Sequence, residues 1–494
     1  MDQLFLKKKL QNGINYLKSK NFQKATKCFE YLLKNPKTEK TGLLHLGIAS
    51  IEQKKENEAL NFFNQILIKD SFHEHANINA GLIYYRQRNY EKSKIYFENV
   101  LNQNSSHLIA NLHKGIIDYK NLNFASALNH FKICEKINEN IPQLQNYLGN
   151  IYFKQNKIEL AIKYYKSAIL KKNNDSRAKY NLSKCYFSKF LYKEALDLYE
   201  FRLSFQINSK AKEVIEKFNP KIWNGENLEG KSILIISEQG IGDTIQFARY
   251  LFYIHEKFNC EIYFYVNKKL LHLFKDCPFN VVSDLNNIKS INYYQYLISL
   301  QRIYYNENKS FYKNINFINS NEKLDYLWKQ KISKFPKPTI AINWQGNPNY
   351  TEDHLRSIPL KYFEKIFYNQ KYNFISLQKG FGSNQIKESN YSKYVVDLSE
   401  SIDLENHIFV DTISILKSVD LLITSDTALA HLAGTMEINT YLILNYNPEW
   451  RWIIETNNKC FYSEKLRILK QKKFNDWQSV FDDLSEKIEN IRIA

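Results

Sequence analysis

The chain has 494 residues, 44% of them hydrophobic, which is enough for two or three domains with substantial cores. Residues 1–210 hold 34 Lys+Arg against 18 Asp+Glu, whereas the rest of the chain is nearly neutral. The composition argues against a membrane span, because no apolar run reaches about 18 residues, and against a zinc or disulfide framework, because no Cys-x-x-Cys pair occurs.

The first residues, MDQLFLKKKLQNG, lack the apolar core of a secretory signal, and six scattered cysteines fit a reducing compartment. We therefore expect a cytoplasmic protein, or one held peripherally at the inner face of a membrane. The positive charge of the first half either serves an acidic or phosphate-bearing partner or only reflects a Lys-rich composition. A nucleic-acid partner would rest on charge alone, so we do not expect one.

Three columns of residues recur every 34 positions in residues 1–203. The first is Gly13, Gly47, Gly81, Gly115, Gly149 and Ser183. The second is Ala25, Ala59, Ser93, Ala127, Ala161 and Ala195. The third is Phe29, Phe63, Phe97, Phe131, Tyr165 and Tyr199. This period, with small residues where two helices cross, resembles the tetratricopeptide repeat (TPR), although the Trp and Pro of the repeat consensus are mostly absent.

About six stacked helical hairpins are therefore predicted, forming an α-helical superhelix. The three columns are explained by packing, and the array offers no catalytic chemistry. Its concave face is expected to bind a protein or glycan acceptor or another partner. Since repeats contact mainly their neighbours, the rest of the chain should form its core without them.

Residues 204–230 lose the 34-residue register and are predicted to be a linker. Short β-rich runs then alternate with helical stretches, which indicates parallel sheets covered by helices. The expected strands are 232–237, 261–266, 295–300, 339–344, 373–378, 394–398, 420–425 and 440–445. We expect two Rossmann-like lobes, at 231–320 and 339–494, joined by a linker at 321–338, with a C-terminal helix and a ligand site beyond the strands' carboxyl ends.

The stretch ILIISEQGIGDTIQFARYL, residues 233–251, places a glycine turn between a strand and a helix. It is a poor dinucleotide cradle, because Ile245 replaces the third glycine of that fingerprint and Asp243 would compete with a pyrophosphate for the helix dipole. The lysine of a P-loop is also missing. Asp243 is either a helix cap or a carboxylate at the mouth of a cleft.

The stretch LLITSDTALAHLAGT, residues 421–435, again runs from a strand into a helix. The free N–H groups of the helix start, the Thr427 hydroxyl and His431 could hold a diphosphate. The alternative is an ordinary helix cap with a buried histidine.

Together the Gly240–Asp243 turn and the Asp426-Thr-x-x-x-His-Leu-Ala turn resemble glycosyltransferase family 9, the ADP-heptose:lipopolysaccharide heptosyltransferases, a subgroup of which carries N-terminal TPRs. INWQGNP, RSIPL, ISLQKG and NPEWRWI follow in a similar order. The resemblance implies the GT-B architecture, with the nucleotide-sugar donor in the C-terminal lobe and the acceptor at the N-terminal lobe. It also implies an inverting, metal-independent hexosyl or heptosyl transfer to a hydroxyl, with no cofactor besides the nucleotide sugar, which could be of the ADP-heptose type.

By this resemblance, Asp243 is the catalytic base, and Asp426 binds sugar or ribose hydroxyls while Thr427, Ala428 and His431 hold the diphosphate. Further residues are expected on the donor side: Trp344, Gly346, Asn347, Arg356, Gln378 and Lys379. The acceptor-side turn is expected to comprise Gly240, Gly242 and Thr244.

Two alternatives remain at this point: a non-enzymatic TPR scaffold with a decayed transferase domain, and a protein O-linked N-acetylglucosaminyltransferase. Retention of Asp243, Asp426, Thr427 and His431 together favours an enzyme. The sugar, the nucleotide base and the acceptor do not follow from the residues.

Overall fold

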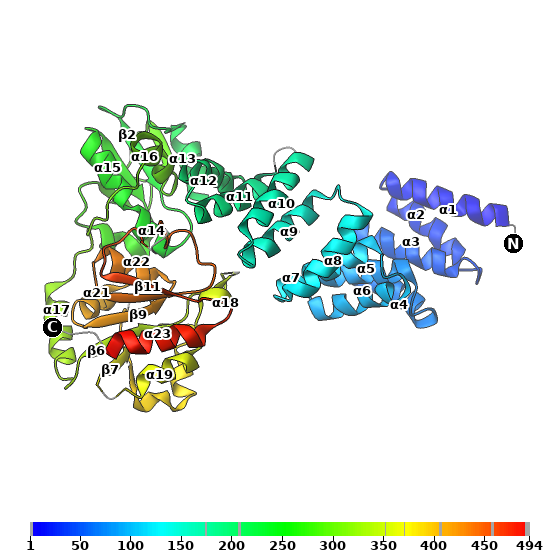
Figure 1. Cartoon of the computed structure of the whole chain (residues 1–494). Coiled ribbons are helices and arrows are strands. Elements are labelled where there is room, and N and C mark those ends of the chain that lie inside the picture. The colour runs from blue at the N-terminus through cyan, green and yellow to red at the C-terminus, as the bar shows by residue number, and fades with distance from the viewer. Residues whose placement is uncertain are drawn as a thin grey trace. The chain divides into compact units, whose positions relative to one another are not determined.

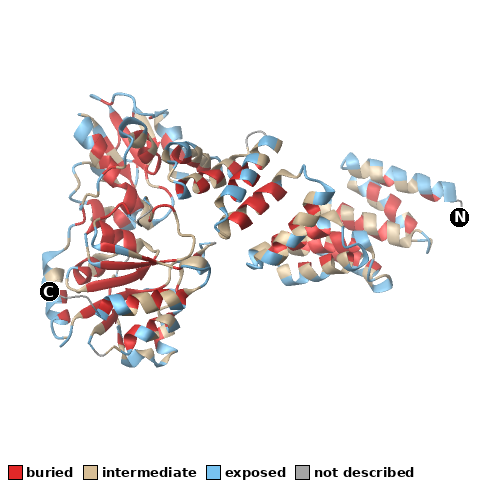
Figure 2. Cartoon of the chain, in the orientation of Figure 1, coloured by how far each residue is buried: buried red, intermediate tan, exposed pale blue. Residues whose placement is uncertain are grey.

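The computed structural model describes residues 3–172, 175–205, 209–350, 352–369, 371–404, 408–455 and 459–489. Its contacts divide the chain into two units, Met1–Asn181 and Leu182–Ala494. Figure 1 shows helical hairpins in the first unit and sheets flanked by helices in the second, and Figure 2 shows the buried residues of each. Within the described ranges, no helix combines the length and apolar character that crossing a membrane requires.

In the described part of the repeats, twelve helices follow one another. In the first unit they are α1 (Gln3–Lys18), α2 (Phe22–Leu32), α3 (Glu39–Glu52), α4 (Glu56–Lys69), α5 (Glu74–Arg86), α6 (Tyr90–Gln103), α7 (Leu108–Lys120), α8 (Phe124–Ile137), α9 (Pro142–Lys154) and α10 (Ile158–Lys171). Helix α11 (Ser176–Ser188) crosses the division between the units, and α12 (Tyr192–Tyr199) belongs to the second.

The glycine and aromatic columns pack against each other within each repeat. A Cβ built on Gly47 would stand 2.4 Å from Cε1 of Phe63, and one on Gly13 would stand equally close to Phe29. The same contact recurs at Gly81, Gly115 and Gly149 with the aromatic residue sixteen positions later. The ring therefore occupies the space that any larger residue in the glycine column would need, which is the packing role expected from the sequence.

Asparagine replaces the tryptophan of the TPR consensus in two repeats. Four residues before the column glycine stand the fully buried Asn77 and Asn111. Asn77 Nδ2 donates to the carbonyls of Ser71 and His73, 2.9 and 3.1 Å away, and Asn111 makes the equivalent pair of bonds. His73 also accepts from Ala76 N–H at the start of α5. These repeats thus use a hydrogen-bonded turn where the consensus uses a large ring.

Gly47→Val is expected to lower the free energy of unfolding of the repeats by about 1–3 kcal/mol, because Phe63 would have to leave its site. Glu52→Val, on an exposed position of the same helix, is the matched control. Urea unfolding followed by circular dichroism measures the difference. Equal stability of the two variants would contradict this account of the glycine column.

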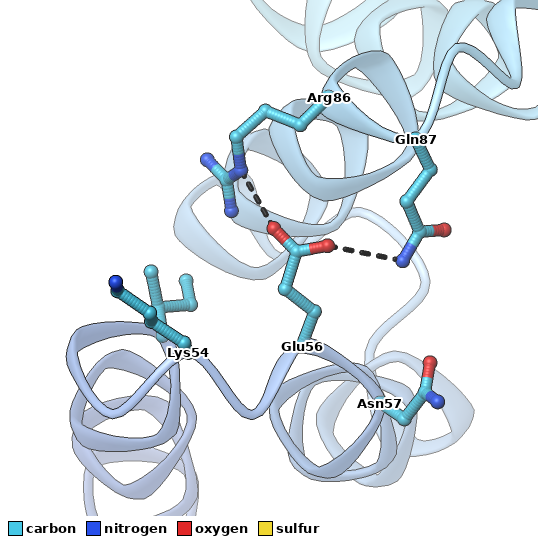
Figure 3. Close-up of a pocket in the computed structure, with 6 residues that line it drawn as sticks. Lys54, Glu56, Asn57, Arg86 and Gln87 are labelled. Carbon is cyan, nitrogen blue, oxygen red and sulfur yellow. Dashed lines mark hydrogen bonds and ion pairs between the residues drawn. The ribbon is translucent and has the colours of Figure 1, made fainter.

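A hollow of about 610 Å³ lies between the second and third repeats (Figure 3), lined by Ile51, Lys54, Glu56, Asn57, Arg86 and Gln87. Glu56 accepts from Arg86 Nε at 2.8 Å and from Gln87 Nε2 at 3.1 Å. In the next repeat, 34 residues later, Tyr90 takes the position of Glu56 and Lys120 that of Arg86. Lys120 Nζ donates to Tyr90 Oη at 3.0 Å. These polar groups link successive repeats to one another.

The N-terminal lobe of the second unit contains a five-stranded parallel sheet of order β1-β5-β2-β3-β4. Its strands are β1 (Lys221–Ile222), β2 (Ser232–Ile236), β3 (Glu261–Tyr265), β4 (Asn280–Val282) and β5 (Tyr293–Tyr296). Its helices include α13 (Ser209–Phe218), α14 (Ile241–Phe247), α15 (Arg249–Lys257) and α16 (Ser299–Asn308).

The C-terminal lobe contains a six-stranded parallel sheet of order β11-β10-β9-β6-β7-β8. Its strands are β6 (Thr339–Asn343), β7 (Asn373–Ser376), β8 (Val395–Asp397), β9 (Leu421–Ser425), β10 (Thr440–Leu444) and β11 (Leu466–Lys470). The helices named below are α17 (Glu322–Ile332), α18 (Asp353–Arg356), α21 (Val410–Leu416), α22 (Ala428–Thr435) and α23 (Trp477–Glu489). This is the strand order of the doubly wound Rossmann fold, whose switch point lies between β6 and β9.

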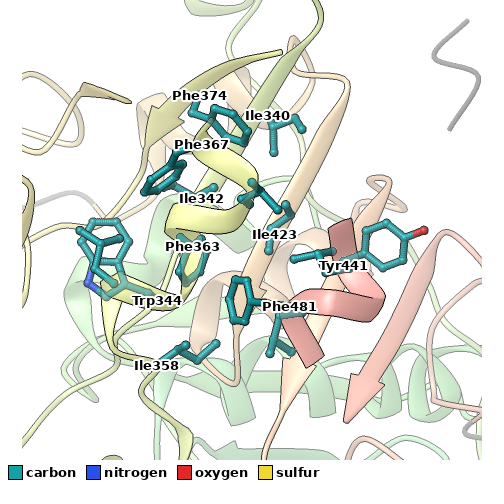
Figure 4. Close-up of a cluster of buried hydrophobic side chains, with 14 of the residues drawn as sticks. Ile340, Ile342, Trp344, Ile358, Phe363, Phe367, Phe374, Ile423, Tyr441 and Phe481 are labelled. Carbon is teal, nitrogen blue, oxygen red and sulfur yellow. The ribbon is translucent and has the colours of Figure 1, made fainter. Parts of the chain in front are cut away.

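Side chains from β6, β9 and α23 form one buried cluster over this sheet (Figure 4). Trp344, predicted to line a cleft, is fully buried in this cluster. That prediction is therefore wrong for its side chain. The reason is that side chains alternate between the two faces of the sheet along β6, and this alternation continues to Trp344, the next residue. Its indole therefore points to the same side as Ile340 and Ile342, into the core.

The segments predicted as linkers belong to the lobes. In residues 204–230, α13 packs Ala211 and Val214 on the first sheet, and β1 adds an edge strand beside β5. In residues 321–338, α17 packs against α21, and Trp328 Nε1 donates to Asp411 Oδ1 at 2.8 Å. Apolar spacing over a single short helix or strand gave too weak a signal to separate these segments from a linker.

The first strand series also differs from the prediction in its details. A strand was predicted at 295–300, but β5 ends at Tyr296 and helix α16 begins at Ser299. Strands β1, β4 and β11 were not predicted. Each is short or carries exposed positions, so the apolar run that signals a buried strand is missing.

Candidate functional site

Two helix N-termini meet in the second unit. Helix α14 starts after Gly240, and α22 starts after Thr427. A Cβ built on Gly242 would stand 2.6 Å from His431 Cδ2 and 3.3 Å from Ala428 Cα. A residue without a side chain allows this approach. The fold thus brings together the two turns that the sequence places far apart.

Asp243 lies in the first turn of α14, and its carboxylate is held from two sides. Oδ2 accepts from Gly240 N–H at 2.9 Å. Oδ1 lies 2.9 Å from Arg451 Nε, and the side chain keeps 17% exposure. The positive end of the helix dipole favours a carboxylate here. Asp243 is therefore a helix cap and also an accessible charge beside the junction of α14 and α22.

The other residues of this turn shape its backbone. The buried Thr244 donates its hydroxyl to the Gly240 carbonyl at 3.1 Å, and Gly242 provides the close approach to α22. That the turn of Gly240, Gly242 and Thr244 faces the acceptor remains a prediction. The Thr244 hydroxyl is already used in holding the turn.

Arg451 is the residue of this site that sequence reasoning missed. Besides Asp243, its guanidinium meets three partners: Nη2 donates to Gln239 Oε1 at 2.7 Å and Tyr199 Oη at 3.0 Å, and Nη1 lies 3.1 Å from Glu449 Oε2. Its side chain is 10% exposed. The sequence contained a signal, since an arginine between two tryptophans in NPEWRWI combines a charge with a buried setting.

The two neighbouring tryptophans fix this arginine by packing on both sides of it along the chain. Trp450 stacks on Phe187, with ring centroids 3.9 Å apart and planes 6° apart. Trp452 stacks on His431 at 4.1 Å. Both indoles are buried. Their faces are therefore covered by other rings and do not offer an open surface to a sugar.

The start of α22 supplies a second acidic residue and a hydroxyl. Burial raises the pKa of the Asp426 carboxyl, while Arg356, the Trp452 indole and Arg451 lower it. Thr427 donates its hydroxyl to Asn343 Oδ1 at 3.1 Å and makes no side-chain cap to α22. Ala428 follows as the first residue of the helix. These residues lie at the switch point of the sheet, where ligands of such folds bind.

His431 is a buried member of the same junction. Its Nδ1 lies 2.9 Å from Tyr462 Oη, and burial lowers the pKa of the ring well below its usual value, as do Arg451 and Arg249. The Arg249 guanidinium lies 5.1 Å from the Tyr462 ring. The ring is therefore neutral, and its Cδ2–Nε2 edge faces Gly242.

His431→Ala is expected to lower the free energy of unfolding by about 2–4 kcal/mol, because it removes a buried stacked ring and its hydrogen bond with the Tyr462 hydroxyl. His431→Phe keeps the stacking on Trp452 and should lose less. Chemical unfolding of both variants measures this. If His431→Phe is as unstable as His431→Ala, the ring stacking is not what stabilises the junction.

Gln378, predicted to contact the donor, instead holds the loop after β6. Its Oε1 accepts from Asn343 Nδ2 and from the N–H groups of Trp344 and Gln345, at 2.8–3.1 Å. Its Nε2 donates to the carbonyls of Gln345 and Phe381. With both ends of the amide engaged, Gln378 positions the loop.

Lys379 and Arg356, the two predicted cations, have different surroundings. Lys379 Nζ donates to the carbonyls of Ile402 and Asp403, so it closes a loop. Arg356 pairs through Nε with Asp353 Oδ1 at 2.9 Å, with 23% of its side chain exposed. Its Nη2 would stand 2.6 Å from a Cβ on Gly346, so the predicted residues Arg356 and Gly346 do come together.

An open pocket of about 460 Å³ adjoins this loop, lined by Gln345, Pro348, Tyr350, Asp353, His354, Ser357, Ile358, Pro359 and Gln385. Asn347 is exposed beside Pro348. The Arg356 guanidinium lies 4.8 Å from the Tyr350 ring centroid. The pocket therefore begins next to Arg356, whose charge partly offsets the burial that raises the pKa of Asp426.

The last repeat is built into the candidate site. Arg202 is fully buried; its Nη2 lies 2.6 Å from Glu238 Oε1, and its Nε donates to Glu238 Oε2 at 3.0 Å. Glu238 belongs to the turn that leads to Asp243, and it also accepts from Ile298 N–H. The contacts divide the chain at residue 181, so most of the last predicted repeat packs with the α/β lobes, and the predicted end of the repeats at 203 is not the border between the two units. Local periodicity carries no record of an ion pair between segments far apart in the chain.

Among the described residues, no group of three or more His, Cys, Asp or Glu is arranged to hold a metal ion.

The comparisons with known proteins concern the repeats. Tetratricopeptide repeat models match residues 74–107 and 145–200. The chain contains tetratricopeptide repeats. Protein FlbA of Caulobacter vibrioides is 22% identical over 279 residues, which cover 49% of this chain and 45% of FlbA. The chain thus spans less than half the length of this curated relative.

Several solved structures are similar to part of this chain. PilF of Pseudomonas aeruginosa is 16% identical (TM-score 0.37), and the match covers 42% of this chain and 95% of that one. PilW, a type IV pilus biogenesis factor, is 20% identical (TM-score 0.36), and the match covers 44% of this chain and 100% of that one. YrrB, a TPR protein with an unusual peptide-binding site, is 18% identical (TM-score 0.33), and the match covers 38% of this chain and 98% of that one.

Proposed function

We propose that the second unit is a glycosyltransferase of GT-B architecture that moves a sugar from a nucleotide-sugar donor to a hydroxyl acceptor. The observation that carries this proposal is the contact of Gly242 with Ala428 and His431. That contact puts Asp243 beside the N-terminus of α22. A base from one lobe then faces a diphosphate-binding helix start from the other, which is the arrangement that such a transfer needs.

In the proposed reaction, Asp243 takes the proton of the acceptor hydroxyl while the hydroxyl oxygen attacks the anomeric carbon. The bond from that carbon to the diphosphate oxygen breaks, and the nucleoside diphosphate leaves with the electron pair. Because the oxygen attacks from the face opposite the leaving group, the configuration is inverted. Asp426 binds sugar or ribose hydroxyls. The Thr427 hydroxyl, the Ala428 N–H and Arg356 stabilise the negative charge of the leaving group.

The repeats are proposed to recruit the acceptor or a protein partner, as repeat arrays commonly present extended binding surfaces. The basic excess of the repeats favours an acidic or phosphate-bearing partner. A cytoplasmic setting, including the inner face of a membrane, follows as part of the same proposal.

Thermal shifts with a panel of nucleotide sugars test the proposal, because a ligand at one hundred times its Kd stabilises the folded state by about 2.7 kcal/mol. A shift with one donor and its free nucleoside diphosphate supports it. If no member of the panel shifts the unfolding temperature, the alternative of a TPR scaffold with a decayed transferase domain gains. Selective stabilisation by a UDP-linked N-acetylglucosamine would favour a protein O-linked N-acetylglucosaminyltransferase.

A chelator is expected to leave turnover unchanged, because the α22 N-terminus and Arg356 supply the positive charge for the leaving diphosphate. The measurement is product formation in EDTA against buffer with added Mg²⁺ or Mn²⁺. Loss of turnover that returns only with one of these ions would show that this account of charge stabilisation is incomplete.

A further inference from the structure

Arg451 lies between the two acidic residues of the candidate site. Its Nε lies 2.9 Å from Asp243 Oδ1 on the α14 side. On the other side, the next residue, Trp452, stacks on His431 of α22 at 4.1 Å, and Gly242, which precedes Asp243, lies against Ala428 and His431. One guanidinium therefore serves as the counter-charge to the proposed base and also stands beside the proposed diphosphate position.

The guanidinium has several partners besides Asp243. Tyr199 and Gln239 hold Nη2, Glu449 holds Nη1, and the flanking tryptophans fix the backbone on either side. Asp243 in turn accepts from Gly240 N–H through Oδ2, the oxygen that does not face Arg451. The ion pair between Arg451 and Asp243 is thus the contact in this network that can be exchanged without dismantling either turn.

We propose that Arg451 is a positioning residue that Asp243 and a bound diphosphate compete for. Without a donor, Arg451 neutralises Asp243. A diphosphate at the start of α22 carries more negative charge than one carboxylate and draws the guanidinium toward itself. Asp243 then loses its counter-charge and is free to accept the proton of the acceptor hydroxyl. The inference rests on the proposed function for its chemistry, but the competition is a property of the binding site alone.

The competition predicts changes in diphosphate affinity that would not occur if Arg451 had only a structural role. Removing the charge of Asp243 should release Arg451 and tighten the binding of a diphosphate. Removing Arg451 should weaken it. With Arg451 absent, the charge of Asp243 should have little further effect. The two substitutions are therefore coupled, as residues that share one interaction are.

Calorimetry with inorganic pyrophosphate, in buffer without divalent ions, tests this on the full chain. Asp243→Asn is expected to tighten binding by about 5–10-fold, and Arg451→Gln to weaken it by at least about 10-fold. Asp243→Asn should change the affinity less than about twofold in the Arg451→Gln background. Arg467→Gln, an exposed arginine on β11, is the charge-matched control and should change nothing.

An unchanged affinity in Asp243→Asn, an equal effect in both backgrounds, or no pyrophosphate binding by the parent chain would each overturn the inference. If Arg451→Gln does not fold, Arg451→Lys takes its place in the cycle, since its shorter reach should shrink the coupling. If the two substitutions are coupled but no nucleotide sugar supports transfer, the competition stands and the proposed reaction is rejected. If transfer occurs but the substitutions are not coupled, the proposed reaction stands and the competition is rejected.

Discussion

Asp243→Asn is expected to lower the turnover of nucleotide sugar by about 10²-fold or more, while the chain still folds and binds donor. The amide cannot take a proton from the acceptor hydroxyl, but its oxygen can still accept from Gly240 N–H, so the start of α14 survives. Loss of the charge on Asp243 should lower the free energy of unfolding by only about 1–3 kcal/mol, because Arg451 keeps Tyr199, Gln239 and Glu449 as partners. Product formation under saturating donor measures the effect.

Asp284→Asn, in the loop after β4, is the matched control for this prediction. It also replaces a carboxylate whose oxygen accepts from a backbone N–H, here that of Asn286. Asp284 is exposed and lies outside the candidate site, so this change should leave turnover within a few-fold of the parent. Turnover by Asp243→Asn at the parental rate would remove Asp243 from the reaction, whatever the control shows.

A chain that starts at residue 204 is expected not to fold stably, whereas one that starts at Asp175 should. The longer chain keeps α11, α12 and Arg202, and the shorter one leaves the buried Glu238 without its cation. Breaking a buried ion pair by removing one partner costs about 3–5 kcal/mol, a large part of the stability of a typical domain. The shorter chain also loses Phe187 and Tyr199, which pack on Trp450.

Soluble yield and a cooperative thermal transition distinguish the two truncated chains. In the full chain, Arg202→Met should reproduce most of the destabilisation, and adding Glu238→Gln should recover part of it, because the second change removes the unpaired charge. A stable, soluble chain from residue 204 onward would show that the last hairpin is only attached to the α/β unit and does not complete it.

The sequence alone determined the features that depend on local periodicity. Columns repeating every 34 residues predicted the helical hairpins, because the space beside a glycine such as Gly47 must be filled by the ring of its own repeat. Continuous apolar runs, as in Ser232–Ile236 and Leu421–Ser425, predicted buried parallel strands. The two glycine and hydroxyl turns could be placed for the same reason, since each follows one of these strands.

Only the tertiary structure decided which of the predicted site residues face one another and which have other tasks. Trp344 lies in the core, and Gln378 and Lys379 brace loops, because side-chain direction and partners at the end of a strand are set by neighbouring segments. Arg451 and Arg202 reach Asp243 and Glu238 from distant parts of the chain. Such long-range charge pairing leaves no periodic trace in the sequence, so the extent of the α/β unit and the surroundings of its proposed base emerge only once the chain is folded.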